Sequence, residues 1–179
     1  MNRTLQFFNY EQCYKHYTRQ IINIRQAKIQ GETIVAKPVL LLALIDGIEE
    51  GVFIDNRITL NDWLIERYGT LMLKYTRDSI FDGFASINNP FWHLETDGFW
   101  HLCFQGERFK KEQTPSTKWL KENVAFASFD EALWILLQNK VWRLQLRNYI
   151  IEHKLTDGSW RGLMVAESLG ILAALLLAA

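Results

Sequence analysis

The chain has 179 residues, with 20 Lys and Arg side chains against 20 Asp and Glu side chains, so its formal net charge at pH 7 is zero. This neutrality argues against a polybasic protein that holds its partners by bulk charge. Hydrophobic residues make up 49% of the chain and charged residues 22%, which excludes intrinsic disorder and predicts a globular domain. The two cysteines, Cys13 and Cys103, form no disulfide framework, so we expect a reducing, cytoplasmic environment.

The charges are distributed unevenly along the sequence. Residues 1–37 contain six cations and two anions, a net charge of +4, whereas residues 38–66 contain one cation and six anions, a net charge of −5. Two further basic stretches lie within residues 107–122 and 140–154. A solvated helix face explains any one of these clusters. Three basic segments around one acidic segment nevertheless indicate a polarised surface.

The first half of the chain predicts three helices. Apolar residues recur at three- and four-residue steps over residues 10–24, which is typical of one face of a helix. Pro38 suits the first position of a second helix, and the apolar run Val39–Ile48 predicts that this helix is buried. Thr59 with Asp62 resembles the cap that opens a third helix.

Aromatic residues are concentrated between positions 81 and 104, where the tetrapeptide Phe-Trp-His-Leu occurs twice, at Phe91–Leu94 and at Phe99–Leu102. Asp-Gly, a strong turn signal, lies between the two copies. The pattern therefore predicts an aromatic β-hairpin, in which Phe91 and His93 share one face of the first arm.

Further helices are expected in the second half. Ser128 and Glu131 resemble a capping box for one helix, and residues 141–150 form an amphipathic pattern typical of another. A last apolar helix is expected from about Leu163.

The expected fold class is α+β: a mainly helical domain packed around a small, antiparallel, aromatic-rich β-hairpin sheet. Residues 1–156 are expected to form this single domain, and residues 157–179 an apolar C-terminal helix appended to it. The uncharged stretch from residue 168 to residue 179 is too short to cross a bilayer as a helix, so no membrane partner is predicted.

Enzymatic function has no positive support in the sequence. A zinc site could be assembled from two Cys and two His side chains: Cys13, His16, His101 and Cys103. Core packing explains these residues equally well. A nuclease centre could combine carboxylates with a lysine, namely Asp130, Glu152 and Lys154, but such a spacing arises readily by chance. The sequence contains no phosphate-cradling glycine loop and no dinucleotide fingerprint, so we predict no catalytic residue, no metal and no cofactor.

A set of short motifs, in their order and spacing, points to a family. The motifs are Lys37–Leu44, Asn56–Ile58, Pro90–Leu94, Asp97–Trp100 and Trp142–Tyr149. With these motifs the chain resembles, from about residue 10 to residue 155, the sulfur-binding domain of McrA-type HNH restriction endonucleases. Those domains recognise phosphorothioate-modified DNA, in which a sulfur atom replaces a non-bridging phosphate oxygen.

The resemblance implies a shallow apolar pocket for the sulfur, built around Pro90 and an adjacent aromatic residue. Sulfur is larger, more polarisable and less strongly hydrated than oxygen, so an apolar contact costs it less desolvation. The implied contacts to sulfur and DNA are Pro90, Asn89, Phe91, His93, Lys37, Arg25, Lys28, Lys118 and Lys121. Where the family often has tyrosine, a small residue and histidine, this chain has Asn89, His93 and Ala36. Asn89 and His93 are expected to make the pocket more polar and smaller.

The nuclease members of the family continue into an HNH domain, which this sequence does not contain. We therefore expect a DNA-binding module of a bacterial modification-dependent restriction system that acts in defence without a nuclease centre of its own. DNA is the expected partner, with a nuclease partner or a homodimer as further candidates. Two alternatives stay open: an interaction or accessory subunit that partners an HNH nuclease, and a nuclease with an unrecognised metal site.

Overall fold

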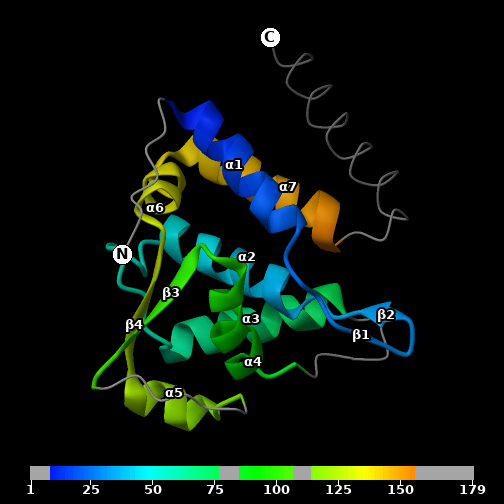
Figure 1. Cartoon of the computed structure of the whole chain (residues 1–179), viewed down its shortest axis with the longest axis vertical. Coiled ribbons are helices and arrows are strands. Elements are labelled where there is room, and N and C mark those ends of the chain that lie inside the picture. Colours follow the sequence, from blue (N-terminus) through cyan, green and yellow to red (C-terminus); the bar gives the residue numbers. More distant parts are fainter. Residues whose placement is uncertain (1–8, 77–84, 107–113, 156–179) are drawn as a thin grey trace, which may run out of the picture.

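The computed structural model describes residues 9–76, 85–106 and 114–155, and Figure 1 shows how its helices and strands are arranged. The predicted apolar helix from Leu163 and the predicted appendage lie outside the described residues. Within the described part, no helix combines the length and the apolar character needed to cross a membrane.

Helix α2 (Ala36–Glu49) forms the centre of the domain, and all its residues from Pro38 to Ile48 are buried. A helix that is apolar on every side must be surrounded by other elements. Among the described residues, four α-helices pack against α2, together with the π-helical turn that follows the last of them: α3 (Asp62–Tyr75), α4 (Asn88–His93), α6 (Glu131–Gln138) and α7 (Lys140–Ile150). The buried helix predicted over Val39–Ile48 is therefore confirmed.

Helix α1 (Tyr10–Ile22) packs against α6 and α7 on one side of the molecule (Figure 1). Its apolar positions, including Tyr17 and Ile21, are buried as the periodicity predicts. Helix α7 is also confirmed and continues into a single π-helical turn, η2 (Ile151–Leu155).

Two small antiparallel sheets lie in the described part of the chain, which confirms the α+β class. Strands β1 (Lys28–Ile29) and β2 (Glu32–Thr33) are joined by Gln30 and Gly31, whose φ angles of 50° and 88° are typical of a tight hairpin turn. Strand β3 (Trp100–Phe104) pairs with β4 (Val124–Phe129). The short helix α5 (Thr117–Asn123) leads directly into β4.

The predicted aromatic hairpin is wrong in its first arm. Residues Phe91–Leu94 form the end of α4 and the start of a 3₁₀ turn, η1 (Leu94–Asp97). Phe91 and Leu94 are fully buried, while Trp92 and His93 between them are partly exposed. This three-residue spacing suits a helix and not a strand. The strand that pairs with β3 is β4, which the pattern did not identify.

The two copies of the tetrapeptide nevertheless contact each other, as a helix against a strand. The rings of Phe91 and Trp100 meet edge to face, with 5.5 Å between their centroids. The indole N–H of Trp100 donates a hydrogen bond of 3.1 Å to the carbonyl oxygen of Phe91. This contact satisfies a polar atom that would otherwise be buried without a partner.

Three predicted helix starts are wrong in detail, although the helices exist. Asn61 caps α3 in place of Thr59. Ser128 belongs to β4, and α6 begins after Asp130 with no side-chain capping bond. Pro38 is the third residue of α2, not the first. Pro38 still occupies the first turn, where a missing N–H breaks no helical hydrogen bond.

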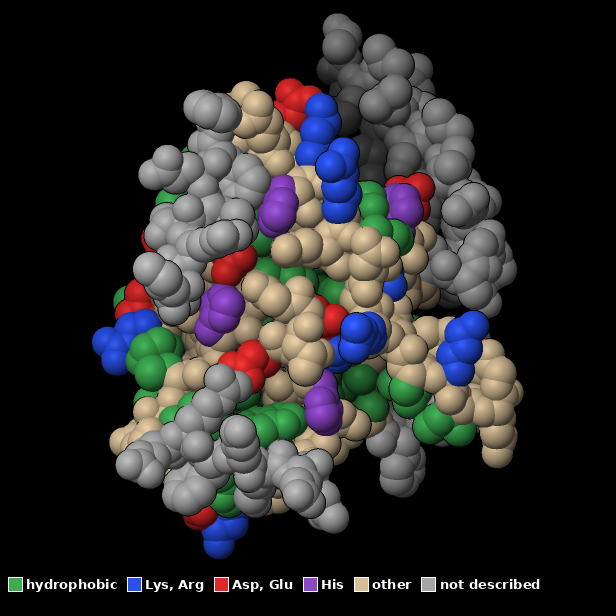
Figure 2. All heavy atoms as spheres, in the orientation of Figure 1, with side chains coloured by type: hydrophobic (Ala, Val, Ile, Leu, Met, Phe, Trp, Pro, Cys, Tyr) green, Lys and Arg blue, Asp and Glu red, His purple; other side chains and the backbone are tan. Residues whose placement is uncertain are grey.

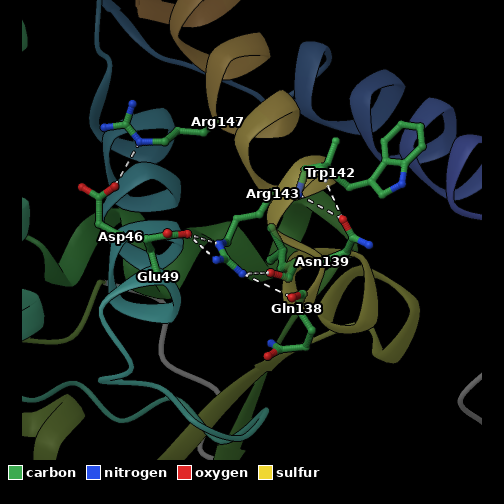
Figure 3. A network of polar contacts seen from close by, with 9 residues as sticks. Asp46, Glu49, Gln138, Asn139, Trp142, Arg143 and Arg147 are labelled. Atoms are coloured by element: carbon green, nitrogen blue, oxygen red, sulfur yellow. Dashed lines mark hydrogen bonds and ion pairs between the residues drawn. The ribbon is translucent and has the colours of Figure 1, made fainter.

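An ion-pair network holds the C-terminal end of α2 (Figure 3). The carboxylate of Asp46, only 8% exposed, accepts hydrogen bonds of 2.7 and 2.9 Å from Arg67 of α3 and of 3.1 Å from Arg147 of α7. Glu49 accepts a hydrogen bond of 2.6 Å from Nε of Arg143, also on α7. The network therefore joins three helices.

We predict that Asp46→Asn lowers the free energy of unfolding by about 2 kcal/mol, because Arg147 loses its carboxylate partner and Arg67 loses the nearer of its two. Urea unfolding measures this change. The control, Glu49→Gln, should cost less than about 1 kcal/mol, because the Glu49 carboxylate is 49% exposed. Equal losses in the two variants would contradict the central role assigned to Asp46.

Candidate nucleic-acid interface

A surface pocket of about 440 Å³ lies where the start of α2, the segment around β1 and β2, and helix α4 meet. Its wall consists of Arg25, Gln26, Ala27, Ile34, Ala36, Lys37, Asn89, Pro90, His93 and Thr96. We call it the Pro90 pocket. Ala27, Ile34, Ala36 and Pro90 provide apolar surface, and the remaining residues provide polar or charged groups.

Helix α4 places three of the predicted residues on the side of the pocket: Asn89 is exposed, His93 is partly exposed and Pro90 is buried. Asn89, Pro90 and His93 line the pocket, whereas the side chain of Phe91 is fully buried against Trp100. Pro90 stands in the first turn of α4, where its missing N–H breaks no helical hydrogen bond. Phe91 therefore packs α4 onto the core through the face opposite the pocket, and it does not line the pocket.

Lys37 is held by a largely buried ion pair. Its Nζ lies 2.6 Å from Oδ2 of Asp97, and the two side chains are only 12% and 6% exposed. The other carboxylate oxygen of Asp97 accepts a hydrogen bond of 3.3 Å from the backbone N–H of Arg25. Asp97 therefore joins α2, η1 and the segment before β1, and it neutralises the charge that Lys37 brings to the pocket.

His93 brings a neutral imidazole to the pocket at neutral pH. Its Nε2 lies 2.8 Å from the hydroxyl oxygen of Thr114. Burial, and secondly the positive charge of Lys37, lowers the pKa of His93 below its usual value of 6.5. The positive charge at the pocket therefore comes from elsewhere.

Exposed, unpaired cations lie beside the pocket. Arg25 on its wall and Lys28 in β1 are exposed, and neither side chain has a hydrogen bond or ion pair within the part of the chain that the structure describes. The side chain of Arg19, on α1, is also exposed and has no hydrogen bond or ion pair among the described residues. Figure 2 shows Lys and Arg side chains over α1 and over the β1–β2 hairpin on a single face of the molecule.

The two lysines predicted on the other side of the aromatic segment are arranged differently. Lys118 and Lys121 lie on α5 and do not line the Pro90 pocket. Lys121 forms an ion pair of 2.6 Å with Asp62, and Lys118 approaches Glu122 at 3.9 Å. Their charges are therefore partly compensated within the protein.

The structure also adds residues that the sequence did not single out for this site. Gln26 and Thr96 line the pocket, and Asp97, predicted only as a turn residue, holds Lys37. No local pattern marks these residues, because they come together only when α2, η1 and the segment before β1 meet.

The other candidate chemistry is not assembled in the described residues. Among them, no three His, Cys, Asp or Glu side chains are grouped so that they could hold a metal ion. Cys13 is buried and donates a hydrogen bond to the carbonyl oxygen of Ala132, and Cys103 is exposed. His101 instead pairs with Asp130 at 2.6 Å.

Known proteins share the family and the fold of this chain. A family model described as ScoMcrA-like, DNA sulfur-binding domain, matches residues 14–171. The structure is similar to a solved one described as the sulfur-binding domain of ScoMcrA complexed with phosphorothioated DNA, with a TM-score of 0.58 and 21% sequence identity. The similarity covers 80% of this chain and 92% of the other, and at this identity it shows a common fold. No curated protein matches the chain.

We predict that Lys37→Met raises the pKa of His93, because it removes a positive charge that opposes protonation of the imidazole. An NMR titration of the His93 ring protons measures this change. Lys118→Met, on α5, should leave the titration unaltered. An unchanged or lower pKa in Lys37→Met would contradict the electrostatic contact.

Proposed function

Because the chain belongs to the family of ScoMcrA-like DNA sulfur-binding domains, we propose that it binds DNA at a phosphorothioate linkage and holds the sulfur in the Pro90 pocket. One observation gives the main support. Asn89, Pro90 and His93, three of the residues to which the resemblance assigns sulfur contact, line a single pocket flanked by the unpaired cations Arg25 and Lys28.

The composition of the wall suits a ligand that is anionic overall and weakly hydrated at one atom. Pro90, Ala36 and Ile34 offer apolar surface on which a sulfur loses little hydration and gains dispersion contacts. The side-chain amide of Asn89 can donate to the remaining non-bridging oxygen of the linkage. His93 is mainly neutral at neutral pH, because its pKa is lowered by burial and by Lys37. It therefore adds no positive charge to the wall of the Pro90 pocket.

The proposed contacts to the DNA backbone separate into two groups. Arg25 and Lys28 give up no internal partner when they bind a phosphate. Lys37 and Lys121 would have to leave carboxylates that lie 2.6 Å away, so we propose that they act on DNA indirectly. A small number of phosphate contacts predicts a modest dependence of affinity on salt.

We further propose that the protein acts in the bacterial cytoplasm as a reader in restriction-type defence, with a nuclease supplied by a partner. This part of the proposal rests on the resemblance to modification-dependent restriction domains alone. Incubation of the purified chain with phosphorothioate DNA and Mg²⁺ or Mn²⁺ tests it, and cutting of the DNA would contradict it.

We predict that the protein binds a duplex with one phosphorothioate linkage at least about fivefold more tightly than the same duplex with phosphates only, since an apolar contact of this size contributes about 1 kcal/mol. Pro90→Ala should reduce the preference and leave affinity for the unmodified duplex nearly unchanged. Gel-shift titrations measure both affinities, and circular dichroism checks the fold of the variant. An undiminished preference in folded Pro90→Ala would exclude Pro90 as the sulfur contact.

We predict that Arg25→Gln and Lys28→Gln each weaken binding to the modified and the unmodified duplex by similar factors. Each should also lower the slope of log affinity against log salt by about one, because one phosphate contact is lost. Lys118→Gln is the matched control, and its slope should change less. If Lys118→Gln had the larger effect, the DNA would have to bind across α5.

A further inference from the structure

A second pocket, of about 360 Å³, adjoins the Pro90 pocket. It lies between α1 and η1 and is lined by Arg19 and Asn23 on one side and by Thr96 and Asp97 on the other. Arg25 and Thr96 line both pockets, so the two form neighbouring compartments of one surface. We call the second one the α1 pocket.

The charged groups of the α1 pocket leave an excess of positive charge. The side chains of Arg19 and Arg25 are exposed and have no internal partner among the described residues. The pocket also contains a carboxylate, that of Asp97. Asp97 is only 6% exposed, and its two oxygens are already engaged by Lys37 and by the backbone N–H of Arg25.

Two of the neutral polar side chains of this pocket, those of Asn23 and Thr96, are held in place by local hydrogen bonds. The side-chain amide of Asn23 donates to the carbonyl oxygen of Arg19 at 2.7 Å, which ties it to the last turn of α1. The hydroxyl of Thr96 donates to the carbonyl oxygen of His93 at 2.7 Å. The two guanidinium groups are the positively charged donors of this pocket, and the guanidinium fork matches the oxygens of a phosphate.

We infer that the α1 pocket binds the phosphate that neighbours the modified linkage on the same DNA strand, with Arg19 as the residue that contacts it. This inference rests on the proposed function, which places the modified linkage in the Pro90 pocket. The two compartments adjoin and share Arg25, so they suit a ligand that carries two neighbouring anionic groups, as consecutive phosphates of one DNA strand do. Arg25, shared by both, lies between the two phosphates.

The test uses duplexes in which one phosphate beside the phosphorothioate linkage is replaced by an uncharged methylphosphonate, on its 5′ side or its 3′ side. The wild-type protein should lose several-fold in affinity at one of the two positions. Arg19→Gln should lose a similar factor on the phosphate duplex and show no further loss on that methylphosphonate duplex. The substitution in the protein and the substitution in the DNA would remove the same contact, so their effects on affinity should not add.

The matched control is Lys15→Gln, one turn earlier on α1. Lys15 already pairs with Glu11 at 2.6 Å, and both side chains are more than half exposed. This variant should keep the full effect of the methylphosphonate. The inference is overturned if Arg19→Gln binds like the wild-type protein, or if its effect and that of the methylphosphonate simply multiply at both positions.

The preference for sulfur separates this inference from the proposed function. If the modified duplex is preferred but Arg19 is not coupled to either flanking phosphate, the inference alone fails. The protein could instead show no preference for the modified duplex while Arg19→Gln and the methylphosphonate remain non-additive on a duplex without sulfur. In that case the Pro90 pocket does not bind sulfur, and the assignment of Arg19 to a phosphate is retained. Absence of binding to every duplex at low salt overturns both.

Discussion

The ion pair between Lys37 and Asp97 connects the buried centre of the domain to its proposed binding surface. Helix α2 is apolar on all sides, and Lys37 near its start can remain within the protein only because Asp97 lies 2.6 Å away. Asp97 also fixes the backbone of Arg25. The pair thus positions α2, η1 and the segment before β1 around the Pro90 pocket. At the other end of α2, Asp46 binds Arg67 and Arg147 and so sets the positions of α3 and α7.

Periodicity predicted α1 and α7 because each of them buries a stripe that repeats within the helix itself, and a continuous apolar run predicted the buried α2. The repeated Phe-Trp-His-Leu tetrapeptide shows where this approach fails, since one copy is helical and the other lies in β3. Four residues cannot determine their own conformation. The first copy follows Pro90 in a helical turn, while the second faces β4, more than twenty positions further along the chain. Pairing at that distance depends on the core, which a short pattern does not describe.

The site could be predicted only in the parts that short motifs describe. The motif around Pro90 predicted Asn89, Pro90 and His93 as contacts, and all three line the candidate pocket. The same motif could not distinguish Phe91, whose side chain turns into the core. A lysine in the sequence likewise does not reveal whether it is paired, as Lys37 is. The α1 pocket combines α1 with η1, more than seventy positions apart, so no linear pattern reveals it.

The division between paired and unpaired charges has a practical consequence for handling the protein. At 1 M salt the screening length is about 3 Å, which removes most attraction between exposed cations such as Arg25 and a DNA backbone. Largely buried pairs such as Lys37 with Asp97 are screened far less. Concentrated salt should therefore wash co-purifying nucleic acid from the folded protein and leave its architecture intact, which recommends a high-salt step during purification.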